Sequence, residues 1–285
     1  MGAPWQVRAK LCAIGLVLLP VSVSLDGIAS RAKAQETGTT CVDPGELARS
    51  VVSIVWNFSQ ARRDRAGREF VGQRATAWFY TSPRLLVTAA HFASELPSDG
   101  WQEAELRQAS WNGEPDIAAR VRLRVSVRGK VSDGHRRGTG PGTGLVKDLA
   151  ILELQDPFPN AQVLDIQPEA TARDAAVLVL GYPAGKMQAA RGIIRESGDF
   201  ARKYPGLALL EVQGSNRLLL NAGASGAPVL DCRQGRVVAV LNGLLTGPTL
   251  PFLPPEHAVI PTPWGSPTNT AVPASTLAAL RDHSP

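Results

Sequence analysis

Short apolar runs separated by turns dominate the pattern of hydrophobic and polar positions along this chain. The run "SVVSIVWNF" (50–58) is rich in β-branched residues, and "VRLRVSV" (121–127) alternates apolar with basic residues at period two. Both patterns are typical of β-strands, and the second is typical of a half-buried strand. Further runs of this kind are "RATAWFYTSPRLLVTAAHF" (74–92, with a turn at Ser82-Pro83), "DLAILEL" (148–154), "AAVLVLGYP" (175–183), "LALLEVQ" (207–213), "LLLN" (218–221), "APVLD" (227–231) and "RVVAVLNG" (236–243).

Only the end of the chain predicts a helix. In "PASTLAALRDH" (273–283), Pro273 and Ser275 are suited to a helix start, and Leu277 and Leu280 would face the core. No long helix is predicted that could connect the strands of a parallel sheet. The pattern therefore predicts an all-β chain of roughly a dozen strands.

Composition agrees with a folded, turn-rich chain. The 285 residues suffice for one large domain or two small ones with a real core. The hydrophobic fraction of 44% and the charged fraction of 19% exclude a disordered chain. The 27 Gly and 22 Pro indicate many turns and short strands.

Residues 1–34 have the features of a signal peptide. Arg8 and Lys10 precede the apolar run 11–25, and Ala32 and Ala34 lie at the two positions that a signal peptidase reads. We expect cleavage after Ala34, with an uncleaved anchor as the alternative. The run is short for a membrane span and is interrupted by proline. We therefore expect a periplasmic or secreted protein with no stable membrane span after cleavage.

Removal of the leader leaves a nearly neutral chain. The whole chain carries 30 basic and 25 acidic residues, and the leader accounts for four of the former and one of the latter. Nucleic-acid binding is therefore not indicated. The cysteines and the four histidines lack the spacing of metal ligands, so we expect no metal and no cofactor. Cys41 and Cys232 can pair in an oxidising compartment, with two free thiols as the alternative.

Small residues crowd around one serine in "NAGASGAPVLD" (221–231). One interpretation of Ser225 is a tight surface turn. The other is a nucleophile that needs space for a substrate carbonyl and for backbone N–H donors. The nucleophile turn of an α/β-hydrolase is excluded, because Ala227 stands where its last glycine belongs and no helix follows.

Two further residues fit a serine nucleophile in an all-β chain. His91 ends the apolar run "LLVTAAH" (85–91), and Asp148 opens "DLAILEL". A histidine base, a buried carboxylate that orients it and a serine with backbone N–H donors are the parts of a catalytic triad. In the order His, Asp, Ser, these motifs resemble those of the trypsin-like serine proteases, specifically the bacterial secreted or periplasmic branch. With "RVVAVLNG" and "NTAVPAS" (269–275), the resemblance covers roughly residues 50 to 283.

The resemblance implies two antiparallel six-stranded β-barrels packed side by side, with a short C-terminal helix. We expect an N-terminal arm over 35–49, a first barrel over 50–160 with His91 and Asp148, and a second barrel over 161–285 with Ser225. A proline-rich segment, 244–268, would lie near the binding cleft, with a plain surface excursion as the alternative.

The resemblance also implies roles for individual residues. Ser225 would attack a peptide carbonyl, His91 would transfer the proton, and Asp148 would orient the imidazole. The backbone N–H groups of Gly223 and Ser225 would form the oxyanion hole. The substrates would be proteins or peptides.

Substrate selection is also suggested by the resemblance. Leu219 would lie at the base of the primary specificity pocket, Leu241 in its wall, and the backbone of Gly243 would pair with the substrate. A pocket for Lys or Arg needs a buried carboxylate, and none of these positions supplies one. Cleavage after apolar or small uncharged residues is therefore expected, unless Asp231 or Glu256, the nearest acids in sequence, reaches the pocket.

Two positions depart from the family pattern. Ala224 stands where many relatives carry Asp or Asn, and Ala227 stands where many carry Gly. Without an acid at 224, a zymogen switch that uses a freed N-terminal amine is not expected. The departures leave a second hypothesis open, in which a protease fold with weak or no turnover serves as a peptide- or protein-binding module.

Overall fold

The computed structural model describes residues 40–63, 67, 69–109, 116–129, 147–169, 171–195, 208–212, 223–245 and 268–281. All of these residues belong to one compact unit, residues 39–285. The predicted signal peptide, Leu219 and most of the proline-rich segment 244–268 lie outside the described residues. No described helix is both long enough and apolar enough to cross a membrane.

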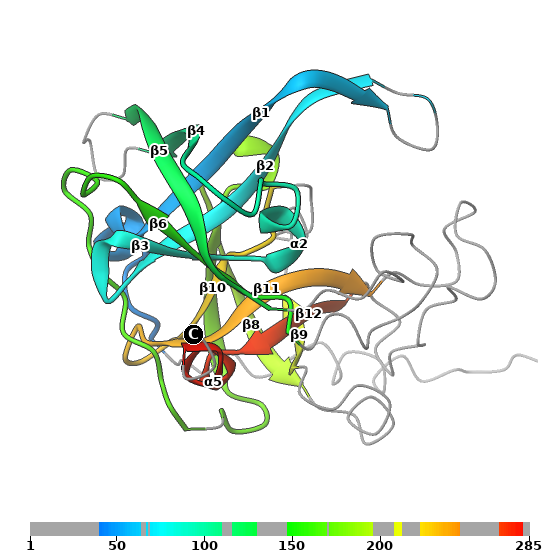
Figure 1. Ribbon diagram of the computed structural model, residues 1–285. Coiled ribbons are helices and arrows are strands. Elements are labelled where there is room, and N and C mark those ends of the chain that lie inside the picture. The colour runs from blue at the N-terminus through cyan, green and yellow to red at the C-terminus, as the bar shows by residue number, and fades with distance from the viewer. Residues whose placement is uncertain are drawn as a thin grey trace, which may run out of the picture. The chain divides into compact units, whose positions relative to one another are not determined.

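Six strands of the first half form a closed antiparallel barrel (Figure 1). The hydrogen-bonded order around it is β1-β2-β3-β6-β5-β4. The strands are β1 (Val51–Arg63), β2 (Glu69–Tyr80), β3 (Ser82–Thr88), β4 (Gln102–Gln108), β5 (Ile117–Arg128) and β6 (Ala150–Leu154). β1 and β2 extend beyond the barrel as a long hairpin.

Six strands of the second half close a second barrel in the order β10-β11-β12-β9-β8-β7. They are β7 (Ala176–Gly181), β8 (Gln188–Arg195), β9 (Ala208–Val212), β10 (Pro228–Asp231), β11 (Val237–Leu245) and β12 (Thr268–Pro273). The predicted all-β double barrel is therefore confirmed. The predicted terminal helix is α5 (Ser275–Arg281).

The other helical segments are short. They are α1 (Pro44–Leu47), η3 (Ala48–Ser50), α2 (Ala90–Ala93) and η4 (Pro183–Gly185). α2 corrects one detail, because His91 does not end a strand: β3 stops at Thr88 and the chain turns into one helical turn. Asp43 begins α1 as its N-cap, with its carboxylate accepting the N–H of Gly45.

Apolar side chains gather in three clusters, one inside each barrel and one between them. The first barrel encloses Phe79, Leu106 and Leu152, among others, and the second encloses Val179 and Val229. Because side chains alternate across a strand, the opposite faces of the same strands are free to form the third cluster. Its members from the first barrel are Val51, Trp78, Tyr80, Val87, Leu149 and Ile151, and those from the second include Leu178, Leu180, Leu230, Val237, Val240 and Val272. The barrels therefore share a dry junction, to which each buried large side chain contributes roughly 1.5–3 kcal/mol.

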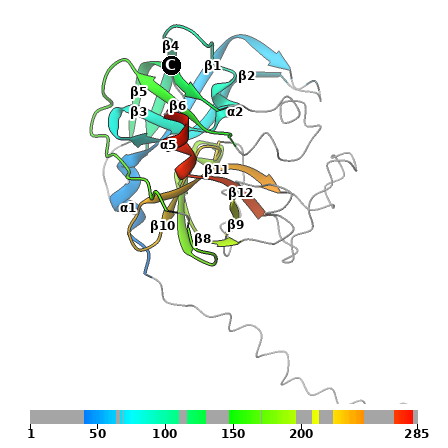
Figure 2. The same ribbon diagram turned by 60° about the horizontal axis from the view of Figure 1, so that its bottom comes forward.

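Two elements tie this junction together. Leu277 of α5 is fully buried in the shared cluster, and Figure 2 shows α5 next to strands of both barrels. Tyr182, just after β7, reaches the first barrel, where its hydroxyl accepts the N–H of Ala109 at 2.8 Å. Burial raises the pKa of Tyr182 to about 12, so the hydroxyl keeps its proton and can donate to the carbonyl of Val51.

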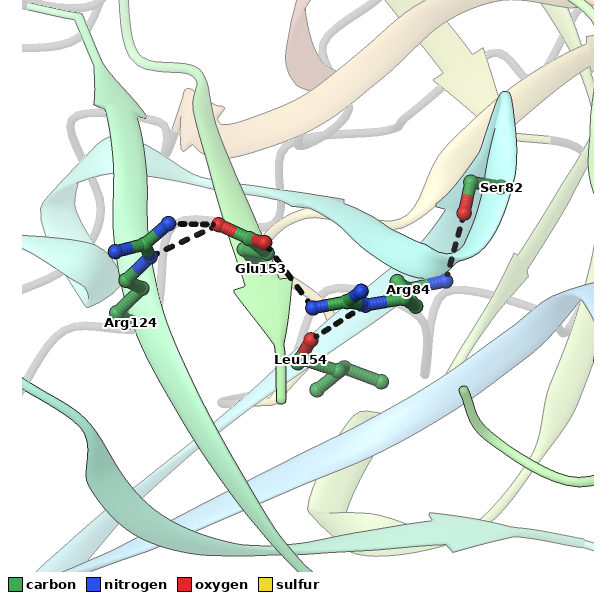
Figure 3. A network of polar contacts seen from close by, with 5 residues as sticks. All are labelled: Ser82, Arg84, Arg124, Glu153 and Leu154. Carbon is green, nitrogen blue, oxygen red and sulfur yellow. Dashed lines mark hydrogen bonds and ion pairs between the residues drawn. The ribbon is translucent and has the colours of Figure 1, made fainter. Parts of the chain in front are cut away.

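Charged side chains connect three strands on the outside of the first barrel (Figure 3). Glu153 of β6 accepts from both Nε and Nη2 of Arg124 on β5, at 2.8 and 2.6 Å. Arg84 of β3 donates to Glu153 at 3.3 Å and to the carbonyl of Leu154 at 3.1 Å. The backbone N–H of Arg84 donates to the hydroxyl of Ser82. Exposed ion pairs contribute about 0–1 kcal/mol each, so the network adds modestly to a register that the core already sets.

A disulfide joins Cys41 to Cys232, which are 191 positions apart. The backbone N–H of Val42 donates to the carbonyl of Cys232 at 2.8 Å, so the arm is also held by a main-chain hydrogen bond. Cys232 itself is buried in the shared cluster. The bridge therefore fastens the segment before β1 to the turn after β10 in the second barrel.

Replacing both cysteines by serine should lower the free energy of unfolding by about 2–4 kcal/mol, because the unfolded chain regains the freedom of a very long loop. Thermal and denaturant unfolding of oxidised protein and of the Cys41→Ser/Cys232→Ser variant measure the difference. Reducing agent should destabilise the wild type to the level of the variant and leave the variant unchanged. A reductant effect on the variant would attribute the loss to another cause.

Candidate active site

Pairing between β3 and β6 brings His91 and Asp148 together. Leu85 pairs with Glu153 and Thr88 with Ala150, in continuous antiparallel register. If this register continues for two more residues, Ala90 at the start of α2 lies opposite Asp148, which precedes β6 by two positions. The strands thus join two segments that are 57 positions apart in sequence.

Asp148 holds His91 by two hydrogen bonds. Its Oδ1 accepts the backbone N–H of His91, and its Oδ2 lies 2.8 Å from Nδ1 of the imidazole ring. An ionised carboxylate can only accept, so Nδ1 carries the proton and Nε2 keeps its lone pair. Asp148 is fully buried, whereas 28% of the His91 side chain is exposed. The pair is therefore a partly exposed imidazole whose orientation is fixed by a buried carboxylate.

The pKa of His91 is raised above 6.5 as the net result of influences that act in opposite directions. Burial is the largest of them and by itself lowers the pKa, because it disfavours the charged ring. The hydrogen bond to Asp148 and the negative charge of Asp148 outweigh it, and Glu95 adds a smaller contribution in the same direction. Glu95 also pairs with Arg62 on the β1–β2 hairpin.

Ser225 lies in a tight turn just before β10, and two glycines shape that turn. Gly223 and Gly226 have φ angles of +103° and +90°, which favour glycine. A methyl group on Gly226 would come within 2.5 Å of Oγ1 of Thr88 and 3.0 Å of the N atom of Ala89. Ala89 is the N-cap residue of α2, so the turn packs directly against the segment that carries His91.

Main-chain hydrogen bonds hold the turn from both sides. The carbonyl of Ser225 accepts the N–H of Thr76 on β2 at 2.9 Å, and the N–H of Gly226 donates to Leu241 on β11 at 2.7 Å. Among the main-chain bonds between described residues, none uses the N–H of Gly223 or of Ser225 as donor. These are the two donors that the sequence assigns to an oxyanion hole.

Thr76 is a positioning residue that the sequence did not reveal. Its fully buried hydroxyl donates to the carbonyl of Gly223 at 2.7 Å and accepts the N–H of Tyr182 at 2.9 Å. Its own carbonyl accepts the hydroxyl of Thr88 at 2.8 Å. One side chain of the first barrel thus joins two segments of the second. The only signal in the sequence was a polar residue inside the apolar run "ATAWFY".

The remaining predicted positions fall into different surroundings. Ala224 and Ala227 are buried in the core of the second barrel, where their methyl groups pack among apolar residues. Leu241 is buried in the same cluster, and its N–H donates to the carbonyl of Ala227 at 2.8 Å. Gly243 pairs with Thr270 of β12.

Comparison with known proteins identifies the family. Residues 75–240 match the family described as the trypsin-like peptidase domain. This match spans more than half of the chain, and it includes His91, Asp148 and Ser225. The chain therefore belongs to the trypsin-like peptidase domain family.

One solved structure shares the fold at low sequence identity, and a second form of the same protein is also similar. An inactive serine-to-alanine mutant of the Rv3671c protease from M. tuberculosis H37Rv is 18% identical, with a TM-score of 0.51 over 88% of this chain and 93% of that chain. The active form of that protease is also 18% identical, with a TM-score of 0.46 over 98% and 94% of the two chains. No curated protein sequence matches this chain.

Removing the charge at position 95 should lower the pKa of His91. The Glu95→Gln variant loses a negative charge that favours the protonated ring, so neutral His91 should persist to a lower pH. Titration of the ring by NMR measures the shift. Glu46→Gln, an exposed change on α1, is the control and should leave the pKa unchanged. An upward shift in Glu95→Gln would contradict this account of the electrostatics.

Removing the hydroxyl of Thr76 should destabilise the protein. Thr76→Val keeps the shape but leaves the N–H of Tyr182 and the carbonyl of Gly223 without their partner, at a cost of about 1–3 kcal/mol. Thr76→Ser keeps the hydroxyl and should recover most of that loss. Denaturant unfolding compares the three proteins. A larger loss in Thr76→Ser than in Thr76→Val would show that the methyl group of Thr76, rather than its hydroxyl, matters.

Proposed function

We propose that this protein is a serine endopeptidase in which Ser225, His91 and Asp148 form a catalytic triad. The His91–Asp148 pair carries the proposal, because a buried carboxylate that fixes the tautomer of a partly exposed histidine is the arrangement a general base needs. The position of the Ser225 turn against the start of α2 supports it. Family membership supports the same reaction class.

In the proposed mechanism, Oγ of Ser225 attacks the carbonyl carbon of a peptide bond as Nε2 of His91 removes the hydroxyl proton. The imidazolium that forms is stabilised by the carboxylate of Asp148. It then protonates the leaving amine, so the C–N bond breaks and an acyl-enzyme remains. A water molecule, deprotonated by His91, attacks the ester, and the proton returns to Ser225 as the acid product leaves.

The tetrahedral intermediates carry a negative oxygen that needs donors. We propose that the N–H groups of Gly223 and Ser225 are these donors. Neither donates to a main-chain carbonyl among the described residues. One donor of this kind is worth about 10²–10³-fold in kcat. Thr76 supports the assignment, because its hydrogen bond to the carbonyl of Gly223 restrains the residue that carries the first of these donors.

We propose cleavage after apolar or small uncharged residues, because the pocket positions inferred from the sequence include no acid. Leu241 is buried, and Leu219 lies outside the described residues. We further propose that the protein is exported to the periplasm or secreted. The Cys41–Cys232 disulfide supports an oxidising compartment, and the N-terminal sequence pattern supports export.

Each member of the triad should be needed for turnover. Ser225→Ala and His91→Ala should each remove nearly all peptidase activity, because the residues act as a unit. Asp148→Asn should reduce kcat by about 10⁴-fold, since an amide favours the wrong tautomer of His91. Steady-state hydrolysis of peptides by the mature chain, with circular dichroism to verify folding, measures both effects.

A fluorophosphonate probe separates the enzyme from a binding module that uses the same fold. Wild-type protein should be labelled, and Ser225→Ala should not. The Arg233→Gln variant, changed on an exposed turn beyond β10, should be labelled as the wild type is. Absence of labelling in folded wild-type protein, or normal turnover in His91→Ala, would overturn the proposed mechanism.

A further inference from the structure

Two cations flank the turn that follows β7. Arg74 projects from β2, and its Nη1 donates to the carbonyl of Ala184 at 3.1 Å. The guanidinium packs directly on Gly185, so a side chain at that position would displace the arginine. Lys186 is the next residue along the chain. An arginine of the first barrel thus contacts a turn of the second barrel that ends in an exposed lysine.

This pair lies next to the turn that carries Ser225. A methyl group placed on Gly223 would lie 3.7 Å from Cδ of Arg74 and 3.5 Å from the N atom of Ala184. Arg74 is two residues before Thr76, so the two side chains leave the same face of β2. Because Thr76 contacts both Gly223 and Ser225, Arg74 borders the proposed reaction centre.

Neither cation has a carboxylate partner among the described residues. Both Arg74 and Lys186 are exposed. The arginines that form ion pairs in the described chain are Arg62, Arg63, Arg84, Arg107, Arg124, Arg173 and Arg195. Arg74 uses one of its five N–H donors on a neutral carbonyl, so its charge and its remaining donors are available to a ligand.

The position of the pair indicates which part of a substrate it would meet. The Ser225 turn is bonded on one side to Leu241 of β11, the strand along which we expect the acyl part of the substrate to run. Arg74 and Ala184 lie on the other side, beside Gly223. A substrate chain that follows β11 and passes over Ser225 therefore places the residues after its scissile bond near the two cations.

We propose that Arg74 and Lys186 form a subsite for an acidic side chain within the first two residues after the scissile bond. This inference rests on the proposed peptidase function. Arginine recognises a carboxylate through two parallel hydrogen bonds, and the lysine adds a second positive charge. Since the site is exposed, the preference is moderate: about 3- to 10-fold for Glu over Gln at low salt, and less as salt screens the charges.

The test uses peptides of one sequence with leucine before the bond and Glu, Gln or Lys at the first or second position after it. Wild type, Arg74→Gln, Lys186→Gln and the double variant are compared for kcat/KM at 50 and 500 mM NaCl. Arg233→Gln removes an exposed positive charge elsewhere and serves as the matched control. The affinities of the same peptides are measured in a Ser225→Ala background, with and without the double substitution.

The wild type and the control should favour Glu over Gln by about 3- to 10-fold, the single variants less, and the double variant not at all. The preference should weaken at high salt. Equal rates for Glu and Gln in the wild type, or a preference that survives in the double variant, would overturn the subsite. If no peptide is hydrolysed, the proposed function fails, and the affinity ratio of Glu to Gln peptides in the Ser225→Ala background still decides whether the subsite exists.

Discussion

The fully buried carboxylate of Asp148 is the constraint on which the site depends. A charge without solvent needs hydrogen-bond donors, and both oxygens of Asp148 take theirs from His91. The arrangement requires β3 and β6 to stay in register, because the two residues come from the ends of those strands. Arg84 on β3 pairs with Glu153 on β6 and supports that register, and Arg124 on β5 donates to the same carboxylate.

The second requirement is that the two barrels stay together, because the histidine and the serine turn belong to different barrels. The apolar junction provides the free energy that holds the barrels together. Thr76 aligns the serine turn of the second barrel with β2 of the first. A buried hydroxyl can do this because it donates and accepts at once. Arg74 leaves the same face of β2 two residues earlier, so the strand that aligns the serine turn also presents a charge beside it.

Much of the fold was predictable from local patterns, and the exceptions have physical causes. β5 was identified by the alternation of "VRLRVSV", whose apolar residues carry a strong signal at period two. β8 was not predicted, because the positions it buries include Ala190 and Gly192, which are too small to show the alternation. His91 was expected at a strand end and lies in α2, because a single helical turn leaves no periodic pattern in the sequence.

The sequence by itself determined the all-β class and the three residues proposed for catalysis, because strand periodicity and the small residues around Ser225 are local properties. Only the tertiary structure decided that Cys41 meets Cys232, that Thr76 joins the barrels, and that Arg74 lies beside the serine turn. Each of these contacts joins segments more than 100 positions apart. Their partners are selected by barrel closure and packing, which no local pattern encodes.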